Sequence, residues 1–188
     1  MTLDDLIAVL ARHQGWIRRA VWVVFLAGVL SFLVRGADNP ADPHVVTATR
    51  TPLTGFPEVV LHVIEPKGGF LEWCAMLAAS QAARERGLMA QSTMRGYDAM
   101  VFRFAAPSSD SFYMYQTVMP LSIAWFDANG RYVSQTDMPP CSAIDPDACP
   151  VFHAKAPYTT AIEVPKGRLA ALGLVPGSAV SFPDGQCR

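Results

Sequence analysis

The sequence predicts a mainly β protein with short helices between its strands, preceded by a single N-terminal transmembrane helix. Two observations lead to this prediction. An uncharged apolar run at residues 20–34 follows a pair of arginines. Beyond it, short alternating apolar segments are separated by turn residues, and 15 prolines among 188 residues favour short strands over long helices.

Residues 15–35 are expected to form a membrane anchor. The apolar run at 20–34 would rise about 22 Å as a helix, so neighbouring residues must complete the span. Arg18 and Arg19 stand directly before the run, and this positive charge favours a cytoplasmic N-terminus. A cleaved signal peptide is the alternative, although Arg35 is unusual near a cleavage site, where small residues are the rule.

The rest of the chain divides around the anchor. Residues 1–14 carry leucine and isoleucine at helical spacing, which predicts a short amphipathic helix on the cytoplasmic surface. Residues 36–57 mix proline, aspartate, threonine and glycine and are expected to be a linker. Residues 58–188 are expected to be the extracytoplasmic β domain of a single-pass cell-membrane protein, with the lipid bilayer as the partner of the N-terminal helix. A formal net charge of −1 argues against nucleic acid as a partner.

The folded domain is expected to consist of short strands joined by turns. Residues 127–130 (Asp-Ala-Asn-Gly) predict a tight hairpin turn; they also begin like a calcium-binding loop, but the glutamate that closes such a loop is missing. Pro120 limits continuous pairing in the segment before this turn. The expected strands are residues 58–64, 70–77, 100–104, 160–164 and 178–182, with one or two more between 111 and 126.

Two short helices are expected among the strands. Ser80 can cap a helix over residues 81–86, and Gly87 can end it in a left-handed conformation. A second helix is expected to run through Leu172, and Gly173 ends it in the same way.

The four cysteines form an even set, as in proteins whose disulfides persist outside the cytoplasm. Cys141 and Cys149 bracket a short polar loop and are expected to form a disulfide. A redox pair and a metal site are weaker alternatives, because the spacing is not Cys-x-x-Cys and further ligands are not nearby. Cys74 and Cys187 either pair or stay free.

Five sequence blocks in the domain occur in a recognisable order: RERGLM at 84–89, GYDAMVFRF at 96–104, FYMYQTVMPLSIAWFDANGR at 112–131, PPC…CP at 139–150 and AIEVPKGRLAALGLVPGSAV at 161–180. Together they resemble the family known as domain of unknown function 192, over residues 59–182. The resemblance implies a compact, mainly β, barrel-like sandwich with one or two short helices. It brings no established activity.

The two charged positions of this family's pattern are absent from the chain. The family often has a lysine where this chain has Tyr115 and an aspartate where it has Ser122, whereas Met114, Thr117, Pro120 and Leu121 match. If the lysine and the aspartate form a site in the family, this chain has lost the charged groups of that site. It then binds something different or serves as a scaffold.

The aromatic segment that begins at Phe112 is the candidate binding surface. Strand alternation puts Phe112 and Met114 on one face and the two tyrosines of the segment on the other. Exposed aromatic rings on a β face can stack on a sugar or a peptide. The candidate binding residues are Tyr113, Tyr115, Gln116 and Thr117.

No catalytic residue, metal ligand or cofactor is predicted. The carboxylates are scattered, and Glu163, which alternates with Ile162 and Val164, is expected to face water. A monovalent copper site built from thioethers is weaker than the explanation that methionines fill the core. The methionines concerned are Met89, Met94, Met100, Met114 and Met119.

The expected function is therefore a binding or accessory module of the cell envelope, whose partner is another envelope protein or a polysaccharide. The alternative is an enzyme that acts on a carbohydrate or another envelope substrate. A concave pocket with two titratable side chains near Tyr115 would favour the enzyme, whereas a flat aromatic patch would favour binding.

Overall fold

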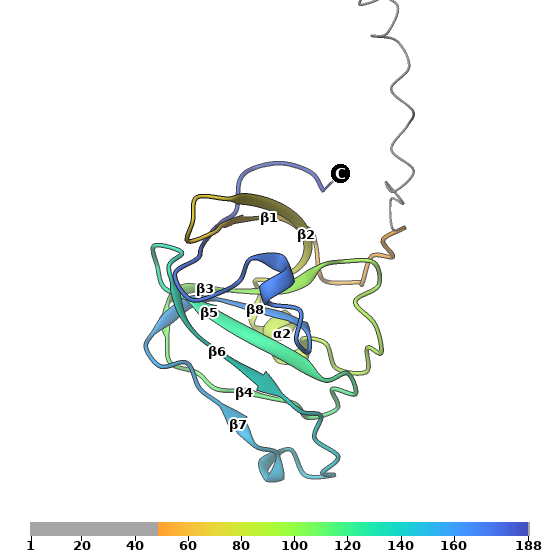
Figure 1. Cartoon of the computed structure of the whole chain (residues 1–188). Coiled ribbons are helices and arrows are strands. Elements are labelled where there is room, and N and C mark those ends of the chain that lie inside the picture. The colour runs from red at the N-terminus through yellow and green to blue at the C-terminus, as the bar shows by residue number, and fades with distance from the viewer. Residues whose placement is uncertain (1–48, 188) are drawn as a thin grey trace, which may run out of the picture. The chain divides into compact units, whose positions relative to one another are not determined.

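The computed structural model describes residues 49–187 (Figure 1). The expected amphipathic helix, the membrane anchor and the first part of the linker lie outside these residues. Residues 49–57, expected as the end of the linker, pack on the domain: Phe56 is buried, and the Thr51 N–H donates to the carbonyl of Arg95. Within the described part of the chain, no helix is long and apolar enough to cross a membrane.

Seven strands form one sheet in the order β6-β5-β8-β3-β2-β1-β9 (Figure 1). Neighbouring strands are antiparallel except β2 and β3, which run parallel. A parallel pair needs a crossover connection, and the segment that contains helix α2 supplies it. The strands are β1 (Glu58–Ile64), β2 (Phe70–Ala78), β3 (Ala99–Ser108), β5 (Leu121–Phe126), β6 (Tyr132–Met138), β8 (Tyr158–Pro165) and β9 (Ala179–Ser181).

The remaining elements are short. A separate two-stranded sheet pairs Phe112 with Phe152 and Tyr113 with Val151. These elements are β4 (Phe112–Tyr113), β7 (Val151–Phe152), helix α2 (Gln81–Arg86) and two 3-10 turns, η1 (Pro146–Ala148) and η2 (Ala170–Leu172).

The fold is mainly β, as expected, but its sheet is not closed into a barrel. The edge strands β6 and β9 come together only where Arg131 pairs with Ala179 in an isolated bridge. At this point the Val180 N–H donates to the carbonyl of Gly130 over 2.8 Å. Because β9 has only three residues, this contact does not extend into the continuous ladder that a barrel requires.

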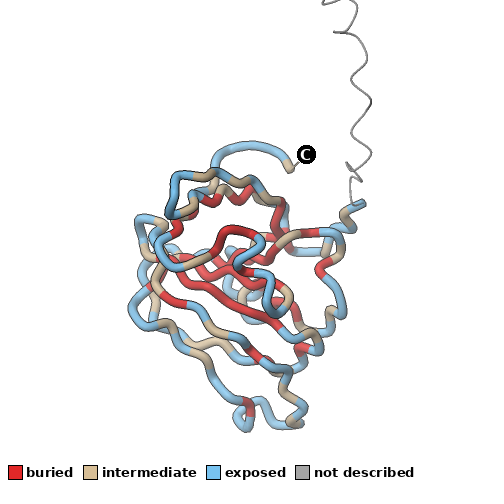
Figure 2. The backbone as a smooth tube through the Cα atoms, viewed as in Figure 1, coloured by how far each residue is buried: buried red, intermediate tan, exposed pale blue. Residues whose placement is uncertain are grey.

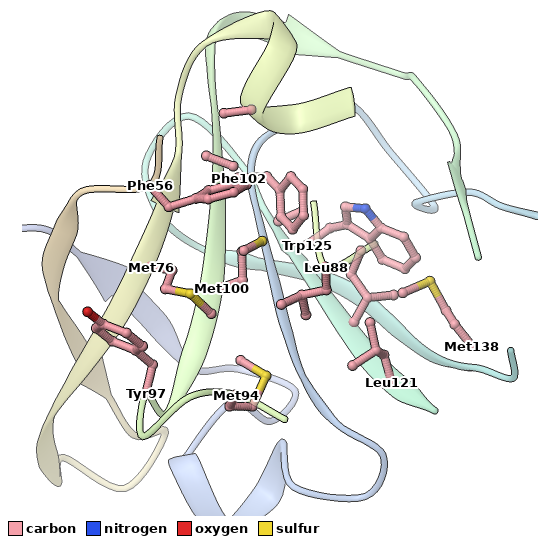
Figure 3. Close-up of a cluster of buried hydrophobic side chains, with 14 of the residues drawn as sticks. Phe56, Met76, Leu88, Met94, Tyr97, Met100, Phe102, Leu121, Trp125 and Met138 are labelled. Carbon is pink, nitrogen blue, oxygen red and sulfur yellow. The ribbon is translucent and has the colours of Figure 1, made fainter. Parts of the chain in front are cut away.

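Each face of the sheet has its own apolar core, and the buried stretches of the chain concentrate in the central strands (Figure 2). One core includes Val101 and Leu172. The other includes Phe102 and Trp125, which lie close to Leu88 in Figure 3. The central strands are therefore covered on both sides, and this decides the environment of the polar side chains that they carry.

The strongest local signals are confirmed. Strand β1 and helix α2 have the expected bounds. The Ala83 N–H donates to the hydroxyl of Ser80 over 3.2 Å. Gly87 ends the helix with a positive φ of 45°, but its ψ of −132° lies outside the expected left-handed helical region. In the hairpin turn, the carboxylate of Asp127 accepts hydrogen bonds from two backbone N–H groups over 2.8 and 2.9 Å.

Other elements differ from expectation. Strand β3 extends to Ser108, and the expected second helix is only the 3-10 turn η2, which ends at Gly173 in the left-handed conformation. Strands β6 and β7 were not predicted. The first is an edge strand of mixed polar composition and the second has only two residues, so neither has a strong alternating pattern.

Two disulfides are present. Cys141 and Cys149 are bonded to each other, as expected. Cys74 and Cys187, whose state the sequence left open, form the second bond, which ties the C-terminal segment to β2. The guanidinium of Arg50 also donates to the carbonyl of Cys187 over 3.3 Å.

Candidate functional site

A pocket of about 280 Å³ lies between helix α2 and the sheet. Its walls come from α2 and the turn after it, from β3 and β8, and from residues 110–117. The volume is at the lower end of the range typical of small-molecule sites. The pocket therefore has room for one ring-sized molecule.

Aromatic rings form much of the pocket wall. Phe102 packs edge-to-face on Phe112 with centroids 5.2 Å apart, and Phe104 does the same on Tyr158 at 5.2 Å. The hydroxyl of Tyr158 donates to the carbonyl of Asp110 over 2.9 Å, and burial raises its pKa to about 12. These rings are held by one another, so the wall is preorganised before any ligand arrives.

Glu163 lines the same pocket from the central strand β8. The residue is only 5% exposed, and its cross-strand neighbours are Met100 on β3 and Ile123 on β5. No hydrogen bond or ion pair to its carboxyl forms among the described residues. Burial raises the pKa of Glu163 to about 8, because the charged form loses its hydration without gaining a partner.

The expectation that Glu163 faces water is therefore wrong. Strand β8 lies between β3 and β5, and residues 160–164 are all buried. Ile162 and Val164 face one core, while Glu163 faces the other core on the pocket side. Alternation correctly separates the two faces, but it does not reveal that both are covered.

Charged groups of both signs surround the mouth of the pocket. The guanidinium of Arg84 lies 4.7 Å from the ring centroid of Phe104 and donates to the carbonyls of Ala79 and Arg103 over 2.5 and 3.1 Å. Arg86 is held in a similar way, over the ring of Phe56 at 4.2 Å and by the carbonyl of Thr54. The carboxyl groups of Glu85 and Asp110 also line the pocket. Two cations and two anions at the mouth give no net charge.

The four predicted binding residues separate in the structure. Tyr113, which is 40% exposed, and the buried Thr117 line the pocket. Tyr115 and Gln116 do not line it: Tyr115 pairs with Cys141 in an isolated bridge, and the carbonyl of Gln116 accepts the Ala90 N–H over 2.9 Å.

Ser122, which stands where the family often has an aspartate, has a structural role. Its hydroxyl donates to the carboxylate of Asp137 over 2.5 Å and accepts the Gly167 N–H over 2.8 Å. It therefore links β5 to β6 and to the turn after β8.

The methionines considered as copper ligands lie in different environments. Met94, Met100 and Met114 are buried core residues, as packing predicts. Met119 packs against the same core, and Met89 lines the pocket.

Sequence reasoning missed the residues that give the pocket its chemistry. Phe104 lies on β3, Tyr158 and Glu163 lie on β8, and the three residues share no motif spacing. The usable signal for Glu163 was its position as the one charged residue in the apolar run Ala161–Val164. A charge inside such a run is a candidate for a buried functional group.

Comparison with known proteins adds the family and the fold. The family model DUF192, described as "Uncharacterized ACR", matches residues 62–182. No curated protein matches the chain significantly.

Two crystal structures have similar folds. A candidate transcription regulator from Sinorhizobium meliloti 1021 is 20% identical, covers 70% of this chain and 98% of its own, and superposes with a TM-score of 0.60. A protein of unknown function from Novosphingobium aromaticivorans DSM 12444 is 26% identical, covers 71% of this chain and 91% of its own, and gives a TM-score of 0.58. The first of these likenesses shows the fold alone.

Proposed function

The chain belongs to the uncharacterised DUF192 family, and from this premise we propose that it is a membrane-anchored, extracytoplasmic binding module of the cell envelope that takes its ligand in the pocket beneath helix α2. The observation that carries the proposal is the preformed aromatic pocket and the buried carboxyl inside it, which has no partner within residues 49–187. Such a combination of apolar walls and a few polar groups is typical of small-ligand sites.

The placement outside the cytoplasm rests on the cysteines and on the N-terminal sequence. All four cysteines are disulfide-bonded, and disulfides persist mainly in oxidising compartments. The apolar run at residues 20–34, with arginines before it, has the composition of an anchor. The partner at this location would be a polysaccharide or another envelope protein that presents a ring-sized group to the pocket.

Two measurements test the proposal. A reporter that is active only outside the cytoplasm, fused after Arg188 of the full chain, should be active, and an inactive but intact fusion would contradict the placement. Small molecules that remain on the full chain after purification in mild detergent should be detectable by mass spectrometry. Replacing Ser111 at the pocket by tryptophan should remove them, whereas the same change at exposed Ser142 should not.

An enzyme remains the second candidate function, because the pocket is concave and titratable side chains line it. A carboxyl that stays protonated near neutral pH suits a general acid, and Asp110 and Glu85 line the same pocket as Glu163. The substrate would be a carbohydrate or another envelope compound. Incubation with cell-wall polysaccharide should then release reducing ends, and Glu163→Gln should abolish the release without preventing substrate binding.

A further inference from the structure

We propose that the pocket selects an uncharged six-membered ring and that Glu163 recognises it by donating a hydrogen bond from its protonated carboxyl to an acceptor on that ring. This inference rests on the proposed binding function and names the chemical class of its ligand. The ring can be a sugar or an aromatic amide, because both offer a flat face and a carbonyl or hydroxyl oxygen.

The first step is that the carboxyl of Glu163 has no partner in the protein. Buried polar groups almost always have a hydrogen-bond partner, either a protein group or an ordered water molecule. The carboxyl of Glu163 has no partner among the described residues, yet it lines an accessible pocket. A ligand acceptor placed there supplies the partner that the protein does not.

The second step is the charge that the pocket tolerates. Glu163 lies between the side chains of Met100 and Ile123, which carry no charge, so an ionised carboxylate would lose most of its hydration without a cation beside it on the neighbouring strands. Burial accordingly favours the protonated form, and the raised pKa agrees with this. The titratable and charged groups that line the pocket with it from other elements are Arg84, Glu85, Arg86, Asp110 and Tyr113, and Tyr158 lines it from the same strand.

Charged ligands are disfavoured for separate reasons. A cation would have to ionise Glu163 and form a buried ion pair, and the desolvation of both ions opposes this where further hydrogen bonds are absent. An anion would meet the guanidinium groups of Arg84 and Arg86, but both already donate to backbone carbonyls and lie over aromatic rings. It would then find no positive charge deeper in the pocket.

The third step is the shape of the pocket. The side chains of Phe102, Phe104, Phe112 and Tyr158 present apolar surface at fixed positions. A volume of about 280 Å³ accommodates one ring with its substituents. A ring face against these walls gains apolar contact, while the carboxyl fixes its orientation.

The experiment measures binding to the full chain in mild detergent with two series of probes, one of sugars and one of benzene derivatives. Each series has a neutral, a cationic and an anionic member. Ligand-observed NMR would measure the binding of methyl glucoside, glucosamine and glucuronate, and of benzamide, benzylamine and benzoate. We expect the neutral member of one series to bind at least about tenfold more tightly than its charged relatives at pH 6.5, a difference of about 1.4 kcal/mol. The series that binds identifies the ring as sugar or aromatic.

Two variants connect the binding to Glu163. In the wild type, binding of the neutral probe should weaken at least about eightfold between pH 6.5 and 9.5, and about thirtyfold where the ionised form does not bind, because only about 3% of a group with a pKa of about 8 is protonated at pH 9.5. Glu163→Gln keeps a donor that does not titrate, so its binding should be constant over this range. Glu163→Leu has no donor and should bind about tenfold less at every pH.

The outcomes are distinguishable. Tightest binding of a charged probe, or wild-type binding that is independent of pH, overturns this inference and leaves the binding function standing. Failure of all six probes to bind the wild type removes the proposed ligand pocket as well. Thermal unfolding of each variant shows whether a loss of binding is a loss of folding.

Discussion

Replacing Glu163 by glutamine should make the stability of the protein less dependent on pH. The pKa of this carboxyl is 4.5 as a reference value and rises to about 8 in the folded protein through burial. Between these values the native state holds a proton that the unfolded state has released. The free energy of unfolding therefore falls as the pH rises through this window, by up to about 1.4 kcal/mol per pH unit.

Between pH 5 and pH 8 this single group should lower the free energy of unfolding of the wild type by about 3.5 kcal/mol. The contribution is almost fully present near pH 4.5 and is lost by the time the pH exceeds 8. Glutamine does not titrate, so Glu163→Gln should be close to the wild type at pH 5 and more stable than it at pH 8. Other ionisable groups act equally on both proteins and cancel in the difference.

Urea unfolding of the full chain in mild detergent, at pH 5, 6, 7 and 8, measures this difference. Glu85→Gln is the matched control, because it makes the same substitution at an exposed position of the same pocket. Its difference from the wild type should not change with pH in this way. A constant difference between wild type and Glu163→Gln across the four pH values would refute the burial of a protonated carboxyl.

Three further predictions concern the fold. Cys187→Ser opens a disulfide loop of sequence separation 113, and Cys149→Ser opens one of 8. Loop entropy therefore predicts that Cys187→Ser lowers the free energy of unfolding in urea by about 2 kcal/mol more than Cys149→Ser does, and equal losses would contradict this. Gly130→Ala should lower the melting temperature more than Gly167→Ala: both positions have a positive φ, but only the first Cβ would meet a backbone oxygen, at 2.1 Å. Asp127→Ala should cost about 2 kcal/mol of unfolding free energy through the hairpin turn, and an unchanged value would show that its two backbone contacts are dispensable.

Much of the local structure could be predicted because its causes are local. Helix α2 follows from a capping serine and a terminating glycine with six good helix formers between them. The hairpin at Asp127 follows from its turn residues, and the Cys141–Cys149 bond follows from the short polar loop that it closes. Each of these interactions joins residues that are close along the chain.

The candidate site could be predicted only in part. The segment that begins at Phe112 was recognised from its aromatic residues, and two of its four predicted residues, Tyr113 and Thr117, line the pocket. The other two do not, because Tyr115 and Gln116 take part in local backbone contacts instead. The sequence pattern pointed to a segment that lines the pocket, without showing which of its side chains share the cavity.

By itself the sequence determined the mainly β class, the family and the positions of most strands, since these depend on composition, on order of motifs and on the period of two along a strand. Only the tertiary structure decided that β8 is an interior strand, that the sheet stays open and that Cys74 reaches Cys187. The physical reason is that burial depends on what covers each face of a strand. For Glu163 the cover comes from helix α2, the turn after it and residues 110–117, which are distant in sequence from β8.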